Sequence, residues 1–485
     1  MLPISRSVRL PRVPSPTRHP RRSTRAAARL TVGLAGLTAA AVLAACGSSG
    51  TSSSTSGGKA AASPSPSASV LAGGKSCGSS ATKITFWAWV PGIARAVTAF
   101  NQTHPSICVT LENPGAGLAE YTPLNNALKA GSGAPDVAEV EYDELPSFII
   151  QKYVVNLVPY GASKYKGDFA PWAWQEVSQG NGVYAMPSDA GPAAFYYNAK
   201  LLAQYHLTPP STWTQFASDA VAVHKANPKV YLANWTPTDL QWLLTAMAQA
   251  GAFPYKYSGG SSVTIDWTGS AQMKFASFWQ NLVNEKAVST VNDANSSPLP
   301  AEDLDNGVVL TSPLESAWAP SYFQPDAKKT LGDWRAAALP QWTAGASVSA
   351  NWGGSTYPVF SQSKHPAQAA EFAEWLTGNQ ASWTILKTPP SELFPTYLPL
   401  LNDPSFKSLT YPVSGNSQPN QVFSTAATEI QPVQWPPFMT EALNQALTTF
   451  QPALNGKATV QQVFQTFQSE EVSYAKAQGF TVSTG

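Results

Sequence analysis

The sequence predicts an α/β protein with more than one domain, and three observations support this prediction. Segments typical of strands alternate with segments whose apolar residues recur at helical spacing, as in βαβ units with a parallel sheet. The chain has 485 residues, too many for one simple core. Midway along it, the runs Val183–Pro187 and Ala193–Tyr197 flank the stretch Ser188–Pro192. Since proline cannot donate to a central ladder, we expect a hinge here between two lobes, with Asp189 at the mouth of a cleft.

The first predicted elements alternate strictly between strand and helix. We expect strands at Lys83–Trp87, Ile107–Leu111 and Asp136–Val140, a helix carrying Ile93, Val97 and Phe100, and a helix carrying Tyr121, Leu124 and Leu128 that ends near Gly131. Right-handed crossovers place the loops that follow such strands at one sheet edge, where α/β proteins bind ligands. Those loops contain Trp87-Ala88-Trp89 and Glu141-Tyr142-Asp143.

After the hinge, the apolar spacing predicts mainly helices. The expected helices are Trp213–Lys225, Asp239–Ala250, Ala271–Glu285, Pro366–Leu376 and Val460–Ala477. We find no internal repeat.

The N-terminal segment has the character of a targeting signal. All eight basic residues before Cys46 are arginine, and an apolar run of small residues and leucine follows at 30–45. The run ends in Leu43-Ala44-Ala45-Cys46-Gly47, which resembles the lipobox of bacterial lipoproteins, and in that family Cys46 would carry the lipid. The alternative is an ordinary secretory signal with an incidental cysteine. We therefore expect a signal peptide over 1–45 and a Ser/Gly/Ala-rich flexible tether over 46–81.

Composition narrows the classes of function. Beyond the arginine-rich segment, 22 Lys and Arg residues face 29 Asp and Glu residues, a net charge of −7. This mildly acidic body argues against a nucleic-acid partner. Only 12% of residues are charged, and the chain has 16 tryptophans, which suits a concave site lined by aromatic rings.

The remaining cysteines, Cys77 and Cys108, come shortly before the first predicted strand and at the start of the second. If these strands are parallel neighbours, both cysteines lie at the same sheet edge, so we expect a disulfide between them. Two free thiols are the alternative. Neither a CxxC motif nor a histidine-rich tract is present, so we expect no metal site and no cofactor.

An ordered series of motifs resembles the extracellular solute-binding proteins of ABC importers, in particular the sugar-binding family 1 branch. Besides the hinge stretch, which resembles the family's "YGVPYD…YYNK" segment, the series comprises Gly131–Val137, Val263–Val288, Asn351–Gly354, Ser363–Phe372 and Phe394–Thr396. The family has a glycine near the end of the second of these motifs, where this chain has Lys286-Ala287. Together the motifs cover nearly all of Thr82–Gln478.

The resemblance implies a two-lobe, periplasmic-binding-protein-like fold of type II with a hinge and an interlobe cleft. The N-terminal lobe would comprise 82–189 plus 356–398, and the C-terminal lobe 192–352 plus 402–478. The protein would be a lipid-anchored, extracytoplasmic receptor that delivers a carbohydrate ligand to an ABC permease. A tethered receptor that presents both lobes is expected to be a monomer.

Sugar recognition requires polar groups that replace the hydration of hydroxyls, and flat apolar surfaces that stack on the ring. The candidate ligand-binding residues are Trp87, Trp89, Glu141, Tyr142, Asp189, Trp235, Trp318, Trp352, Gly353 and Trp435. For each tryptophan, core packing is the competing interpretation, and we assign Trp279 and Trp375 to packing. Glu141 and Asp143 could equally be solvated. Asp189 is the favoured acid, because the family places an acidic or polar side chain there.

Other classes of function remain open at this point. A cell-surface glycoside hydrolase would need two carboxylates about 5–10 Å apart. Glu141 and Asp143 are the nearest such pair, but no glycosidase motif surrounds them, so we predict that the protein is not an enzyme. An adhesive surface lipoprotein would leave the ordered motifs unexplained. Within the binding-protein class, a peptide and a polyamine are the alternative ligands, and a polyamine would call for a more acidic pocket than the sequence locates.

Overall fold

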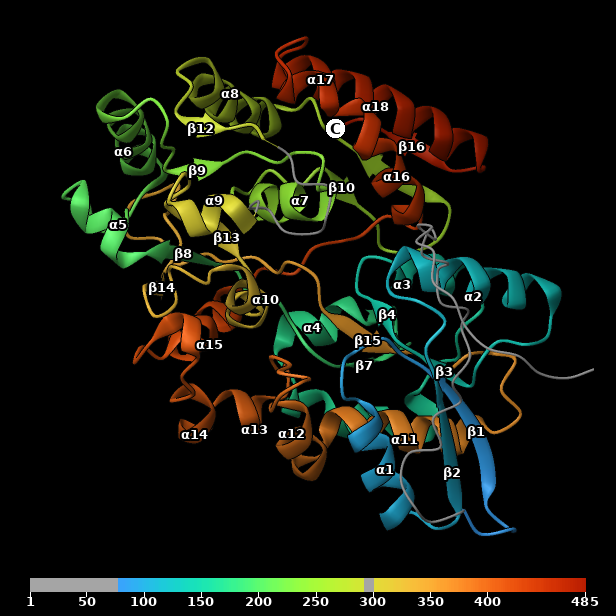
Figure 1. Ribbon diagram of the computed structural model, residues 1–485. Helices are drawn as coiled ribbons and strands as arrows, with labels where there is room; N and C mark the ends of the chain where they lie inside the picture. Colours follow the sequence, from blue (N-terminus) through green and yellow to red (C-terminus); the bar gives the residue numbers. More distant parts are fainter. Residues whose placement is uncertain (1–76, 292–300) are drawn as a thin grey trace, which may run out of the picture. The chain divides into compact units, whose positions relative to one another are not determined.

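The computed structural model describes residues 77–291 and 301–485 (Figure 1). The expected signal peptide, Cys46 and the tether up to residue 76 lie outside the described residues. None of the helices in the two described ranges combines the length and the apolarity of a membrane span.

The elements that we call the first lobe include two three-stranded sheets and one two-stranded sheet. In one sheet, β1 (Thr82–Trp87) lies between β2 (Ile107–Glu112) and β3 (Val137–Ala138), and all three strands are parallel. In the other three-stranded sheet, β15 (Ser355–Tyr357) lies antiparallel between β4 (Val140–Glu141) and β7 (Met186–Pro187). The remaining elements are α1 (Ala94–Thr103), α2 (Leu118–Ala130), α3 (Leu145–Ile150), η1 (Val158–Tyr160), η2 (Ala162–Asp168), α4 (Pro171–Glu176), β5 (Ser178–Gln179), β6 (Gly182–Val183), α11 (Pro366–Gly378) and α12 (Gln380–Leu386). The expected βαβ arrangement is therefore confirmed.

The third expected strand, Asp136–Val140, is interrupted. β3 pairs with β1, whereas β4 pairs with β15, and Glu139 stands between them. The buried Glu139 carboxylate accepts hydrogen bonds from Trp89 N, 3.0 Å away, and from the Ser355 hydroxyl, 2.9 Å away. The chain therefore changes partner at a polar residue, which connects the two sheets.

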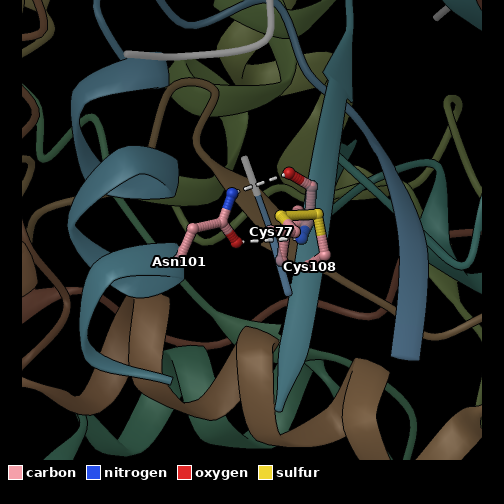
Figure 2. Close-up of a disulfide and its surroundings, with 4 residues drawn as sticks. Cys77, Asn101 and Cys108 are labelled. Atoms are coloured by element: carbon pink, nitrogen blue, oxygen red, sulfur yellow. Dashed lines mark hydrogen bonds between the residues drawn. A yellow bond between two sulfur atoms is a disulfide. The ribbon is translucent and has the colours of Figure 1, made fainter. Parts of the chain in front are cut away.

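A disulfide ties the start of β2 to the segment before β1 (Figure 2). Cys77 and Cys108 are joined, with their Cα atoms 5.7 Å apart. Next to them, the Asn101 side chain of α1 donates to Val109 O and accepts from Val109 N, each over 2.9 Å. The edge of the sheet is thus fixed both covalently and by a side-chain amide.

The elements that we call the second lobe gather around three sheets. β8 (Ala194–Asn198) lies antiparallel between β13 (Thr311–Glu315) and β14 (Trp334–Ala337); β9 (Ala233–Asn234) pairs with β12 (Val288–Ser289); and β11 (Ser262–Ile265) lies between β10 (Tyr255–Lys256) and β16 (Thr481–Ser483). The helices are α5 (Ala199–Gln204), α6 (Trp213–Ala226), α7 (Leu240–Gln249), α8 (Ser270–Asn284), α9 (Ala301–Asn306), α10 (Ala319–Asp326), α13 (Leu398–Leu401), α14 (Pro404–Lys407), η3 (Pro412–Ser414), α15 (Pro419–Glu429), α16 (Met439–Thr449), α17 (Gln451–Leu454) and α18 (Val460–Ala477). The residues at which the chain passes between the lobes stay a prediction.

The helices expected after the hinge are confirmed as α6, α7, α8, α11 and α18. Most of the strands between them were not expected. Several have only two residues, such as β9 and β12, and so are too short to show an alternating pattern.

The stretch Ser188–Pro192 separates β7 from β8 and is flanked by two other segments. Trp352 N donates to Gly191 O over 2.9 Å, and Ala190 N donates to Phe394 O over 2.8 Å. A Cβ atom on Gly191 would lie only 2.0 Å from Trp352 O, so no other residue fits this approach. The predicted interruption of the strand is confirmed, and three segments of chain meet there.

Candidate functional site

The candidate site begins at the loop that follows β4. Tyr142 and Asp143 lie there, and they line a narrow pocket with room for about one water molecule. α7 contributes Gln241 and Thr245 to the lining. The rest of the lining comes from Asn351, Gly353, Gly354 and Trp435. Both lobes and the segment before β15 therefore form the wall.

Hydrogen bonds connect the two lobes across this pocket. The side-chain amide of Gln241 donates to Asp143 Oδ2 over 2.9 Å and, more weakly, to Glu141 Oε1 over 3.4 Å. Within the second lobe, the Thr245 hydroxyl of the same helix donates to Asn351 O over 2.9 Å. On the first lobe, the Tyr121 hydroxyl donates to Glu141 Oε2 over 3.1 Å. A helix of the second lobe thus holds Glu141 at the end of β4 and Asp143 in the loop that follows.

The carboxylates at the end of β4 and in the loop after it have few positive charges nearby to compensate their own. Burial, and then the charge of Asp143, raises the pKa of both Glu141 and Glu144 above the usual range. Burial also raises the pKa of Asp143, although its hydrogen bond with Gln241 opposes the shift. The Thr440 hydroxyl donates to Glu144 over 2.7 Å, which is a neutral contact.

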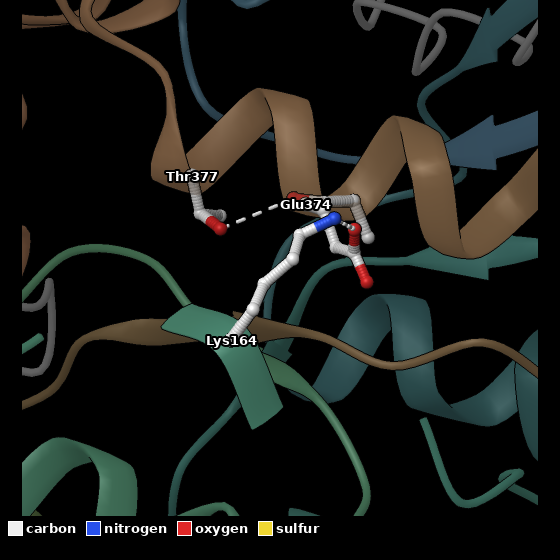
Figure 3. A network of polar contacts seen from close by, with 4 residues as sticks. Lys164, Glu374 and Thr377 are labelled. Carbon is white, nitrogen blue, oxygen red and sulfur yellow. Dashed lines mark hydrogen bonds and ion pairs between the residues drawn. The ribbon is translucent and has the colours of Figure 1, made fainter. Parts of the chain in front are cut away.

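In the described part of the chain, the one ion pair is Lys164–Glu374, with nitrogen and oxygen 3.1 Å apart (Figure 3). It joins η2 to α11, where Thr377 donates to a backbone oxygen of the same helix. Glu141, Asp143 and Glu144 take no part in this ion pair. Among the described residues, no lysine or arginine therefore forms an ion pair with a carboxylate of the pocket.

Several predicted residues meet at the pocket. Tyr142, Gly353 and Trp435 line it. Trp435 is 9% exposed, and its indole nitrogen donates to Glu176 Oε2 over 2.9 Å, which fixes the plane of the ring. Glu141 lies one residue before the lining and shares Gln241 with Asp143.

Two further tryptophans lie beside the lining without belonging to it. Trp352 is partly exposed and precedes Gly353 in the chain. The ring of Trp318, at the start of α10, lies against the Gly353 backbone, where an added Cβ would be 2.8 Å from the ring. Gly353 also has a positive φ of 80°, so glycine is required at this wall for two reasons.

The first predicted loop contributes less than expected. The Trp87 indole nitrogen donates to Glu112 Oε2 over 2.9 Å, at an exposed position on the neighbouring strand. Trp89 packs edge-on against Tyr121, with ring centroids 6.2 Å apart. Neither tryptophan lines the pocket.

Asp189 does not lie at the mouth of a cleft, contrary to the expectation. Its side chain is only 2% exposed and accepts a hydrogen bond from Ser355 N over 3.2 Å. Its backbone oxygen lies against Gly354, where an added Cβ would be 2.7 Å away. The residue therefore joins the stretch between β7 and β8 to the start of β15 and the glycine before it.

The expectation for Trp235 is also wrong. Its side chain is 0% exposed and stacks on Trp279, with ring centroids 4.6 Å apart. Trp242 packs edge-on against both rings. Trp235 therefore belongs to the core of the second lobe, and the packing role assigned to Trp279 is confirmed.

Sequence reasoning missed five lining residues: Asp143, Gln241, Thr245, Asn351 and Gly354. Asp143 could have been selected, because it follows the same strand as Glu141. Gln241 had a weaker signal, since it lies in the first turn of α7 next to the N-cap Asp239. Within residues 77–291 and 301–485, no group of three or more His, Cys, Asp or Glu side chains is arranged to hold a metal ion.

The chain is similar in sequence to known proteins. The profile of the bacterial extracellular solute-binding protein family matches residues 88–383. An arabinooligosaccharide-binding protein of Halalkalibacterium halodurans is 25% identical over 326 residues, which cover 63% of this chain and 70% of that protein.

Solved structures of binding proteins are similar to this chain as well. The ABC transporter associated binding protein of B. animalis subsp. lactis, in complex with beta-1,6-galactobiose, has a TM-score of 0.71 and 27% identity and covers 83% of this chain and all of its own. The galacto-N-biose-/lacto-N-biose I-binding protein of Bifidobacterium longum, in complex with lacto-N-biose, has a TM-score of 0.71 and 25% identity, and covers 83% of this chain and 99% of its own.

Proposed function

The chain belongs to the bacterial extracellular solute-binding protein family, and we propose that it captures a sugar or oligosaccharide between its lobes and passes it to the permease of an ABC importer. The observation that carries this proposal is the pocket to which both lobes and Trp435 contribute. An indole face beside the polar groups of Asp143 and Asn351 suits the C–H faces and hydroxyls of a sugar ring.

Closure of the lobes supplies the working step. A ligand that contacts Asp143 on one lobe and Thr245 on the other gains both contacts only when the lobes are closed. Binding therefore shifts the population toward the closed form. A permease that recognises this form would accept loaded receptor in preference to empty receptor, and the ligand would leave unchanged, without catalytic turnover.

Membrane attachment is a proposal from the sequence. Cleavage before Cys46 and lipidation of this cysteine would anchor the protein outside the cytoplasm, with the segment up to residue 81 as a tether. Mass spectrometry of the mature N-terminus tests this: an acylated Cys46 supports it, and an unmodified N-terminus at another residue contradicts it.

A thermal-shift screen against a carbohydrate panel tests the capture of a sugar, because a bound ligand raises the apparent melting temperature. The panel includes arabinooligosaccharides and galactobiose, the kinds of ligand that the relatives' names carry. A hit whose composition is unchanged after incubation supports the proposal. Hydrolysis of the hit, or the absence of any hit, contradicts it.

Trp435→Ala is the sharpest variant for this pocket. We expect a loss of affinity of about tenfold for the hit, since one stacked ring contributes on the order of 1 kcal/mol. Trp435→Phe retains an aromatic face and is expected to stay within about threefold. Calorimetric titration measures both, and Trp375→Ala, on α11 and outside the pocket, is the control. Unchanged affinity in Trp435→Ala would remove this pocket from ligand binding.

A further inference from the structure

A wider groove lies next to the narrow pocket along the interface between the lobes. The chain segments that follow Asp143 and Trp435 line the pocket first and then the groove, which they reach at Ser147 and Pro437. The groove has a volume of about 590 Å³, within the range of roughly 300–1,000 Å³ that is typical of ligand pockets. The pocket itself has room for about one water molecule, so the space for further sugar units lies in the groove.

Both lobes build this groove. The first lobe contributes α2 and α3, and the second lobe contributes α16, the end of α18 and the residue before β16. The Thr440 hydroxyl, which lines the groove, donates over 2.7 Å to Glu144, the residue after Asp143 of the pocket. A ligand in the groove therefore contacts both lobes, as a ligand of the pocket does.

The wall from the second lobe is aromatic. Phe438 packs edge-on against Tyr474 and against Phe480, with ring centroids 6.0 Å apart in each pair. Tyr474 and Phe480 are partly exposed, so part of their surface is open to the groove. Exposed aromatic surface of this kind suits the C–H faces of sugar rings.

The groove also has side-chain amides without protein partners. Asn125 and Asn126 on α2 and Gln478 at the end of α18 line it, and their side chains form no hydrogen bond with another described residue. An amide group both donates and accepts, as a sugar hydroxyl does. These three amides can therefore replace the water that hydroxyls lose on binding.

The remaining lining argues against other classes of ligand. Lys129 on α2 and Glu441 on α16 are the charged residues of the groove, and their charges cancel. A polyamine or an acidic ligand would thus gain no net charge attraction there. An extended peptide usually pairs with a strand edge, but none of the described strands lines the groove.

We propose that this groove holds the outer units of an oligosaccharide, with a ring stacked on Tyr474 and hydroxyls bonded to the amides of Asn125 and Asn126. This inference rests on the proposed capture of a sugar and narrows its substrate class to chains longer than two units. It makes Tyr474 and Asn126 determinants of the preferred chain length.

The test compares the two-unit and five-unit members of three linear series in the panel: α-1,5-arabinan, β-1,4-galactan and α-1,4-glucan. In a series that binds, calorimetric titration of the wild-type protein is expected to give binding of the five-unit member that is tighter by about tenfold or more, because the added units gain stacking and hydrogen bonds. Tyr474→Ala removes the ring. We expect this variant to reduce the gain to less than about threefold and to leave the affinity for the two-unit member within about threefold.

A second variant acts from an exposed position. Asn126→Trp fills the groove and is expected to abolish the gain in the same way, which keeps the test decisive if Tyr474→Ala fails to fold. Tyr160→Ala, on η1 and outside the groove, is the matched control and is expected to retain the gain. Equal affinity for the two lengths overturns the inference, and so does a gain that survives in either folded variant. Pentaglycine binding as tightly as the five-unit saccharide overturns its saccharide part.

The inference and the proposed function fail in different ways. If a two-unit saccharide binds without a gain from length, or the five-unit members do not bind while a smaller sugar of the panel does, the groove inference is wrong and the capture of a sugar stands. If no saccharide of the panel binds, the proposed function itself is wrong.

Discussion

At the scale of single residues, the tryptophans divide between core and site. Trp235 lies in an aromatic stack, whereas Trp435 shows 9% of its surface and faces the pocket. Both precede or follow polar residues in the sequence, so the local pattern was equal for the two. An indole has a large apolar face and a polar nitrogen, so it can lie either in a core or at a binding site. Only the tertiary packing therefore distinguishes Trp235 from Trp435.

This division predicts opposite phenotypes. Trp235→Ala is expected to lower the free energy of unfolding by about 3–5 kcal/mol, since it leaves a cavity beside Trp279 and Trp242. Urea denaturation measures the loss. Trp87→Ala, at a partly exposed position, is the control and should lose clearly less. A loss for Trp235→Ala below that of the control would contradict the core assignment.

At the scale of elements, Lys286 explains how a departure from the family pattern is accommodated. The residue follows α8 with a positive φ of 53°. Lys286 N donates to Val283 O, and Ala287 N donates to Leu282 O, which together form a Schellman motif. The glycine that the family has near this point would adopt this conformation without a Cβ penalty.

Lys286→Gly is therefore expected to stabilise the protein by about 1 kcal/mol, despite the greater entropy of glycine in the unfolded chain. Thermal or urea unfolding measures the gain. Lys274→Gly, inside α8, is the matched control and is expected to destabilise by roughly 1 kcal/mol. A loss of stability in Lys286→Gly would show that the lysine side chain has another role.

The sequence predicts some elements of the fold closely and misses others. The strands β1 and β2 and the helices α6 and α8 were predicted within two residues, because their periodicity is clear over several positions. The break at Glu139 was missed, since it results from hydrogen bonds to Ser355, which is 216 residues away. At the site, the loop after β4 was predicted from its place at a sheet edge, whereas Gln241 depends on how a distant helix approaches that loop.

At the scale of the whole molecule, buried acids are a general property of the chain. Burial raises the pKa of Glu139 and Glu471 to about 8 and that of Asp189 to about 7. Glu139 lies between β3 and β4, Asp189 lies between β7 and β8, and Glu471 lies on α18. These groups bind protons more tightly in the folded state than in the unfolded chain, where their pKa is near 4.

The stability that they contribute is present at low pH and is lost as the pH rises through their folded pKa values. We expect the melting temperature to fall between about pH 5 and pH 8, measured without ligand. Glu139→Gln can keep the hydrogen bonds from Trp89 N and Val90 N and removes one titrating group, so the fall should be shallower. A melting temperature that rises over this range would contradict the prediction.

The disulfide at the edge of the first sheet decides how the protein must be prepared. The bacterial cytosol keeps thiols reduced, so material made there would have separate Cys77 and Cys108 thiols. Their link closes a segment of 31 residues, and the chain-entropy relation assigns about 3–4 kcal/mol to its loss. Secretion to the periplasm, or refolding in a glutathione redox buffer, would yield the cross-linked form for titration.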